Sequence, residues 1–204
     1  LNELAIAVGL APTVAIAIFI YQKDRYDREP VSLLLKLFVF GALTVIPVYF
    51  IEKFLSYFNI FTGALGVAYT AYNEKLDGII YSVFSALGFA TVENLMYIFI
   101  GQSNYIYVGV TRGLLAVPAH TLFGVTMGYY LSLSKFSKND AESIVYYRRS
   151  LYIPVMLHGI YDFILMINLE GLMVVFLAFV FYLWKSNLSK LNEYVNESKF
   201  ENEG

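Results

Sequence analysis

Long apolar stretches, separated by short polar segments, recur along this 204-residue chain. A helix that crosses a bilayer needs about 20 mostly apolar residues, and several of the stretches approach or reach that length. Charged residues make up only 15% of the chain, whereas soluble domains contain about 25%. We therefore predict an all-α integral membrane protein, a polytopic transmembrane helical bundle with about seven spans. The stretches are 4–22, 31–52, 59–72, 78–100, 106–134, 151–168 and 171–184.

The remaining composition narrows the partners and the chemistry. We expect one transmembrane domain over residues 1–187 and a polar cytoplasmic tail over 188–204, with the lipid bilayer as the main partner. The net charge is −2 and there is no long basic tract, so nucleic acid is not an expected partner. The chain has no cysteine, which excludes disulfides, thiolate metal ligands and a cysteine nucleophile.

Lys and Arg residues cluster in alternate connections between the stretches. Basic residues are concentrated on the cytoplasmic side of membrane proteins, so we expect a multi-pass protein of the cell membrane with its N-terminus outside and its C-terminus in the cytoplasm. This parity requires 59–72 to cross the membrane. The basic residues in the alternate connections are Lys23, Arg25, Arg28, Lys75, Lys135, Lys138, Arg148, Arg149, Lys185, Lys190 and Lys199.

The third stretch is too short for an ordinary span. Residues 59–72 would reach only about 21 Å as a helix, whereas the hydrocarbon layer is about 30 Å thick. The stretch is therefore either a re-entrant piece or a place where the chain lacks residues.

Four ionisable residues lie deep inside the predicted spans, where a charge is costly and marks function by default. They are Glu93, His120, His158 and Asp162, and the two histidines are the only ones in the chain. If the spans are centred in the membrane, all four fall within a slab about 10 Å thick. His158 and Asp162 are four residues apart, so they project from one helix face.

These residue types suit the hydrolysis of a peptide bond. His120, His158 and Asp162 form a workable ligand set for Zn²⁺, which lowers the pKa of a bound water to about 7. Glu93 would act as general base and then protonate the leaving amine. Two alternatives remain open: Asp162 orients His158 instead of binding the metal, or Glu93 and the histidines activate water without a metal.

Other interpretations compete with catalysis. A single intramembrane histidine commonly forms an interhelical hydrogen bond, and Glu93 could simply pair with Arg112 as a buried ion pair. Arg112, and Asn94 beside Glu93, are further candidate residues of the site, with Arg112 as a structural or substrate-carboxylate contact. A proton-coupled transporter also uses intramembrane acids and histidines, although inverted repeats are not evident. A non-catalytic scaffold explains the hydropathy but not the ionisable cluster.

Five ordered segments resemble the PrsW family of intramembrane proteases, which is distantly related to the CAAX prenyl protease group. The resemblance implies a multi-pass membrane protease that makes the first cut in a single-pass anti-sigma factor, starting a proteolytic cascade, and metal-dependent chemistry by analogy. The segments are YQKDRYDREP at 21–30, DGIIY at 77–81, FATVENLMY at 89–97, PAH at 118–120 and HGIYDF at 158–163.

The chain departs from the family pattern at one important point. The resemblance implies a catalytic Glu-Glu pair, followed by a basic residue, in the span before the Asp-Gly motif, and this sequence contains no Glu-Glu pair. The expected place is between Gly66 and Asn73, within and just after the short third stretch. We hypothesise that a segment carrying the pair is absent, which would leave the chain catalytically incomplete.

Several glycines predict close contact between helices. Gly124 and Gly128 follow His120 at intervals of four residues, a spacing typical of tightly packed membrane helices. Gly88, Gly113 and Gly159 are expected to admit close helix approach as well.

Overall fold

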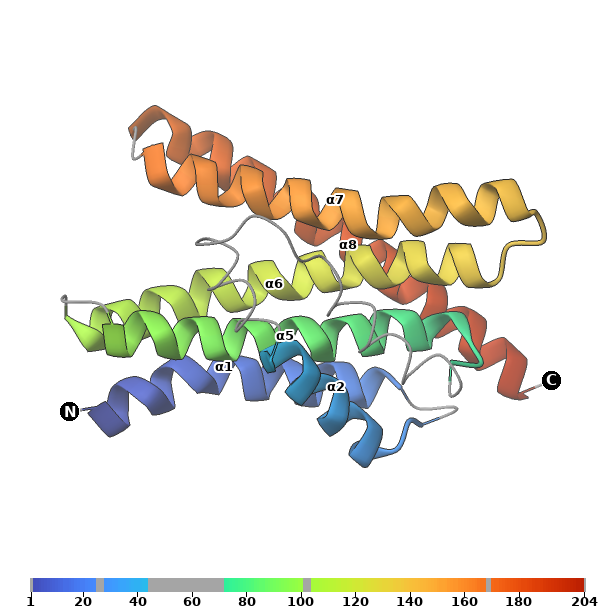
Figure 1. Cartoon of the computed structure of the whole chain (residues 1–204), viewed down its shortest axis with the longest axis horizontal. Coiled ribbons are helices and arrows are strands. Elements are labelled where there is room, and N and C mark those ends of the chain that lie inside the picture. The colour runs from blue at the N-terminus through green and yellow to red at the C-terminus, as the bar shows by residue number, and fades with distance from the viewer. Residues whose placement is uncertain (1, 25–27, 44–71, 101–103, 168–169, 204) are drawn as a thin grey trace.

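The computed structural model describes residues 2–24, 28–43, 72–100, 104–167 and 170–203. The regular elements in these ranges are all α-helices, which confirms the predicted class. Figure 1 shows the helices forming an elongated bundle. They are α1 (Asn2–Lys23), α2 (Val31–Leu43), α5 (Lys75–Ile100), α6 (Tyr105–Lys135), α7 (Asp140–Ile167) and α8 (Glu170–Glu203).

Four helices, α1, α5, α6 and α8, are long and apolar enough to cross a membrane. Helix α2 has only 13 residues, and α7 carries four charged residues within its first ten. The prediction of about seven spans is therefore too high for the described part of the chain. Residues 44–52 of the second predicted stretch and 59–71 of the third lie outside the described residues.

Helices α5 and α6 form the centre of the bundle. Helix α5 contacts α1, α2, α6 and α8, while α6 also contacts α1, α7 and α8. In Figure 1, α1, α5 and α6 run along the long axis of the bundle and α2 lies obliquely to them. A large buried core includes Ile20 of α1, Leu34 of α2 and Leu87 of α5. Val125 of α6 belongs to the same core. Close packing of these side chains holds the four helices in fixed positions relative to one another.

A second, smaller core joins α6, α7 and α8. It contains Phe123, Tyr161 and Phe176, each 5% exposed or less. This core fixes the inner face of α7, the helix that carries His158 and Asp162. The outer face of α7 remains exposed and apolar, with Tyr152 and Phe163 each more than 60% exposed, as expected for a surface in contact with lipid.

The two ends of the bundle differ in charge. In Figure 1 the N-terminus, the end of α5 and the end of α7 lie at one end, and the C-terminus lies at the other. Lys23 at the end of α1, Lys75 at the start of α5 and Lys135 at the end of α6 lie at the C-terminal end. The bundle therefore gathers these basic residues at a single end, as the alternation in the sequence requires.

The last part of α8 packs on the bundle. Asn187 accepts a hydrogen bond from the Thr126 hydroxyl at 2.9 Å, and Tyr194 is 1% exposed. Further along, the Glu197 carboxylate lies 2.9 Å from the Lys75 ammonium group. The polar residues after 187 thus continue a helix that ties the C-terminal end of the chain to α5 and α6.

Glycines permit the closest helix contacts, as predicted for most of them. A Cβ atom added to Gly88 would overlap the Phe38 carbonyl of α2, and one added to Gly128 would overlap the Gly78 carbonyl of α5. At Gly113, an added Cβ would lie 3.2 Å from the side chain of Pro12 in α1. The prediction is wrong for Gly159, because no described atom lies within 4 Å of such a Cβ. Gly159 instead lies on the open side of α7.

The difference between the crowded Gly128 and the open Gly159 predicts a difference in stability between their alanine variants. Replacing Gly128 with Ala should lower the thermal unfolding midpoint in detergent, because the added methyl group forces α5 and α6 apart and overpacking costs about 1–3 kcal/mol. Gly159→Ala is the matched control, since it places the same methyl group in open space and raises helix propensity. An equal or smaller loss of stability for Gly128→Ala than for Gly159→Ala would contradict the observed α5–α6 contact.

Candidate active site

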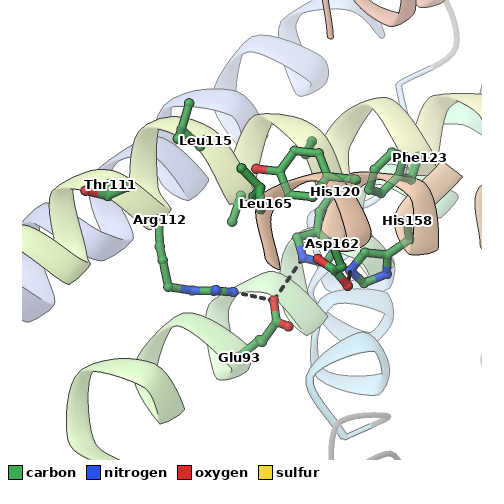
Figure 2. A pocket seen from close by; sticks show the side chains of 12 residues that line it. Glu93, Thr111, Arg112, Leu115, His120, Phe123, His158, Asp162 and Leu165 are labelled. Carbon is green, nitrogen blue, oxygen red and sulfur yellow. Dashed lines mark hydrogen bonds and ion pairs between the residues drawn. The ribbon is translucent and has the colours of Figure 1, made fainter. Parts of the chain in front are cut away.

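A pocket of about 200 Å³ lies between α5, α6 and α7. Figure 2 shows that Glu93, Arg112, His120, His158 and Asp162 gather around it. Its other walls are mainly apolar, so a few polar groups are presented in an otherwise apolar cavity, as in many binding sites. The lining residues are Glu93, Thr111, Arg112, Leu115, Ala116, Ala119, His120, Phe123, His158, Tyr161, Asp162 and Leu165.

Glu93 of α5 and His120 of α6 are in direct contact. The Glu93 Oε2 atom lies 3.0 Å from His120 Nε2, and the His120 residue is only 6% exposed. The two residues are 27 positions apart in sequence, so the contact depends on the close packing of α5 against α6. The structure therefore brings together an acid and an imidazole that hydropathy alone could only place at similar depth.

His158 of α7 completes the group. Its ring centroid lies 4.9 Å from that of His120, and the two rings are nearly perpendicular. Phe89 packs beside both imidazoles, and Phe123 lies 5.4 Å from the His158 ring. The sequence analysis did not predict a role for either Phe. The sequence did contain a signal for both Phe residues. Phe89 precedes Glu93 by one helical turn and Phe123 follows His120 by three residues, so each shares a helix face with a site residue.

The donor set suits a metal ion. One ligand atom from each of Glu93, His120 and His158 lies within 4.8 Å of the other two, close enough for the three side chains to hold one ion. Two imidazoles and a carboxylate are a ligand set that zinc accepts in catalytic sites, with a further position left for water. The residues therefore fit a metal of this type.

Asp162 has a different position from the one expected of a ligand. Its Oδ2 atom lies 3.3 Å from His158 Nε2, and its side chain is 54% exposed. The group of three possible ligands contains Glu93 where we had expected Asp162. This placement matches the alternative in which Asp162 orients the His158 ring, a role that carboxylates commonly have beside metal-binding histidines.

Arg112 does pair with Glu93. Its Nη2 atom lies 2.6 Å from Glu93 Oε2, and its Nε atom donates to Asn94 Oδ1 at 2.9 Å. The guanidinium also lies over the Tyr97 ring, 3.8 Å from the ring centroid. Tyr97 was missed by the sequence analysis, although its position one turn after Glu93 places both side chains on one face of α5.

All six candidate residues therefore meet in one region of three helices. The ion pair does not by itself distinguish a structural role for Glu93 from a catalytic one. Its setting is informative, however, because the same carboxylate oxygen also contacts His120, which lies beside the second histidine. A purely structural ion pair requires neither imidazole.

Comparisons with known proteins identify the family of this chain. A model of the PrsW family intramembrane metalloproteases matches residues 61–185, which include all of these site residues. Among curated proteins, Protease PrsW of Clostridioides difficile is 38% identical over alignments covering 94% of this chain and 92% of the relative. Protease PrsW of Bacillus subtilis is 34% identical, covering 91% and 93%. Protease PrsW of Oceanobacillus iheyensis is 31% identical, covering 97% and 98%.

All three alignments are longer than this chain. They extend over 218, 207 and 219 positions, more than its 204 residues. Because an alignment between two chains can exceed the length of one only through internal gaps in it, these relatives have internal residues with no counterpart here. A missing internal segment would produce such a difference.

No solved structure matches this chain. The family match covers more than half of the chain, and the relatives above cover nearly all of it. The matched region includes Glu93, His120 and His158, the three groups that could hold a metal ion. The chain therefore belongs to the PrsW family of intramembrane metalloproteases.

Proposed function

We propose that this protease makes the first cut in a single-pass membrane protein, using Glu93, His120 and His158 to activate a water molecule. The observation that carries the proposal is the convergence of these three side chains, from three helices, to within 4.8 Å of one another. Neither of the alternative functions, proton transport or a non-catalytic scaffold, needs two imidazoles and a carboxylate at this spacing.

The chemistry assigned to the side chains is general acid and base catalysis. Glu93 removes one proton from water as the water oxygen attacks the carbonyl carbon of the scissile peptide bond. As the C–N bond breaks, Glu93 returns the proton to the amide nitrogen, so that one water is consumed and two chain ends are formed. A bound zinc ion would polarise the water and the carbonyl oxygen.

His120 and His158 would hold that ion through one ring nitrogen each, and Glu93, the third side chain of this group, would act on the water rather than serve as a ligand. Asp162 would keep the His158 ring in position. The aromatic rings of Phe89 and Phe123 beside the imidazoles support this assignment, because they limit ring rotation and exclude bulk water. Polar interactions gain strength where water is excluded.

Within the site, Glu93 of α5 lies closer to one end of the bundle, whereas His120 lies at the middle of α6 (Tyr105–Lys135). Glu93 is seven residues before the end of α5, or about 10 Å along the helix. This is the end opposite the basic residues, and the positive-inside rule places it outside the cell. Cleavage would then occur in the outer half of the membrane, with the N-terminus outside and the C-terminus in the cytoplasm.

The resemblance to the family supports an anti-sigma factor as the substrate. Such a substrate crosses the membrane once, and its helix would have to approach the pocket from the lipid. The open face of α7 near Gly159 supports this route, because no described side chain covers it. A helix lying there would bring its backbone next to His158 and Asp162.

The site residues should be essential for cleavage in a reconstituted system containing a single-pass anti-sigma substrate. Glu93→Gln, His120→Ala and His158→Ala should each reduce kcat by about 10²–10⁴-fold, the usual effect of removing a general base or its partner. Gel analysis of substrate and product over time measures the rate. Glu142→Gln, an exposed change at the start of α7, is the matched control and should cut normally. Normal cleavage by both histidine variants would refute the assigned site.

Metal removal tests the cofactor separately. A strong chelator should abolish cleavage, and added Zn²⁺ should restore it, because a zinc ion held at this site would polarise the water and the carbonyl oxygen. The metal content of the purified protein, measured by atomic emission, should fall in His120→Ala and His158→Ala. Full activity in a metal-free preparation would instead support direct activation of water by Glu93 and histidine.

The missing Glu-Glu pair yields a quantitative expectation. If Glu93 alone replaces the carboxylates that the family resemblance implies, this chain should cut more slowly than the Bacillus subtilis relative on the same substrate, by about 10²-fold or more. The two kcat values are compared under identical lipid and metal conditions. Equal rates would show that Glu93 is sufficient and that the pair is dispensable for this chain.

A further inference from the structure

We propose that Arg112 is a positioning residue for Glu93: it holds one carboxylate oxygen in place so that the other is the one that acts on water or metal. The proposal rests on the catalytic role assigned to Glu93 above. It adds a residue that does not itself touch the reacting atoms, and it identifies Asn94 and Tyr97 as the groups that fix Arg112.

The hydrogen bonds of the Glu93 carboxylate are strongly asymmetric. Arg112 Nη2 lies 2.6 Å and His120 Nε2 lies 3.0 Å from the same oxygen, Oε2. Among the described residues, no side chain bonds to the other oxygen, Oε1. A carboxylate with one oxygen engaged by two donors has a preferred orientation, and its second oxygen is left for the chemistry.

Arg112 is itself firmly held. Its Nε atom donates to Asn94 Oδ1 at 2.9 Å, and Asn94 is 1% exposed. Because Nε and Nη2 belong to one planar guanidinium, the bond to Asn94 also fixes the direction of the bond to Glu93. Lysine has a single ammonium group without this planar geometry, so it could not form both contacts in the same way.

The Tyr97 ring packs against the face of the Arg112 guanidinium. The Arg112 Cζ atom lies 3.8 Å from the Tyr97 ring centroid, which is a close cation–π contact. Glu93 and Tyr97 are four residues apart on α5 and Asn94 lies three residues before Tyr97, so a single helix supplies these three partners of Arg112. The arrangement is therefore built into α5 and is completed when α6 packs against it.

The same contacts argue against a direct role in substrate binding. An arginine that captures a substrate carboxylate needs both arms of its fork available for a bidentate contact. In Arg112, one arm is engaged by Glu93 and the Nε atom by Asn94. Its side chain is only 21% exposed, which also limits access.

Kinetics of Arg112 variants test the proposal in the full-length protein with the single-pass substrate. Arg112→Met should lower kcat by about 10- to 100-fold, the range expected when a catalytic group is misplaced by about 1 Å, while KM stays near the wild-type value. Arg112→Lys should restore part of the lost kcat, because it keeps the charge but not the planar geometry. Arg149→Met is the matched control, since Arg149 also lies over a tyrosine ring but does not line the pocket.

Tyr97 variants provide a second test that leaves the charged pair intact. Tyr97→Phe keeps the ring face and should retain a higher kcat than Tyr97→Leu, which removes the ring and should lower kcat with little change in KM. These variants test the proposal if Arg112→Met does not fold, because that change removes the ion-pair partner of the half-buried Glu93 carboxylate and leaves it only its contact with His120. Thermal unfolding of each variant shows whether the protein remains folded, and Glu93→Gln combined with Arg112→Met should recover stability relative to Arg112→Met alone.

The possible failures can be told apart. Normal cleavage by Glu93→Gln would overturn the proposed role of Glu93 and this inference with it. Loss of cleavage in Glu93→Gln, together with wild-type kcat in folded Arg112→Lys and Tyr97→Leu, would overturn the positioning role alone. A raised KM with unchanged kcat in those variants would also overturn it, because that result indicates contact with the substrate.

Discussion

The carboxylate of Glu93 is the constraint on which the rest of the site depends. A charge inside a membrane bundle is tolerated only when it is paired or hydrogen-bonded, because the low dielectric there makes an unpaired charge very costly. Arg112 and His120 both contact the same oxygen of Glu93. These contacts require α5 and α6 to keep one relative position, so the electrostatics of the site and the packing of the bundle are linked.

Small residues make that position possible. At Gly128 the backbone of α6 comes so close to Gly78 of α5 that even a methyl group would overlap it. In a membrane, helices associate largely through such close contacts and interhelical hydrogen bonds, since lipid tails are as apolar as the side chains. Close contact near one end of the helix pair and the ion pair toward the other together hold α5 and α6 in register along their length.

Helix α7 has the opposite character on its outer side. It brings His158 and Asp162 to the pocket, but the added space at Gly159 and the exposed side chain of Asp162 leave that side uncovered by described residues. The single-pass substrate proposed above would reach the pocket from this side. The same feature explains why a prediction based on glycine alone failed at this position: a glycine permits close approach without requiring it.

The sequence by itself determined the membrane class, the all-α architecture and the identity of the ionisable residues, because apolar length and the cost of a buried charge can be assessed along the chain without knowing the fold. The PrsW-like segments also indicated the family. Only the tertiary structure showed that a Glu93 oxygen lies within 4.8 Å of a nitrogen of each imidazole, and that Tyr97 and Asn94 contact Arg112. Those contacts depend on how far α5, α6 and α7 are rotated and shifted against one another, and helical periodicity specifies a face of each helix but not its partner.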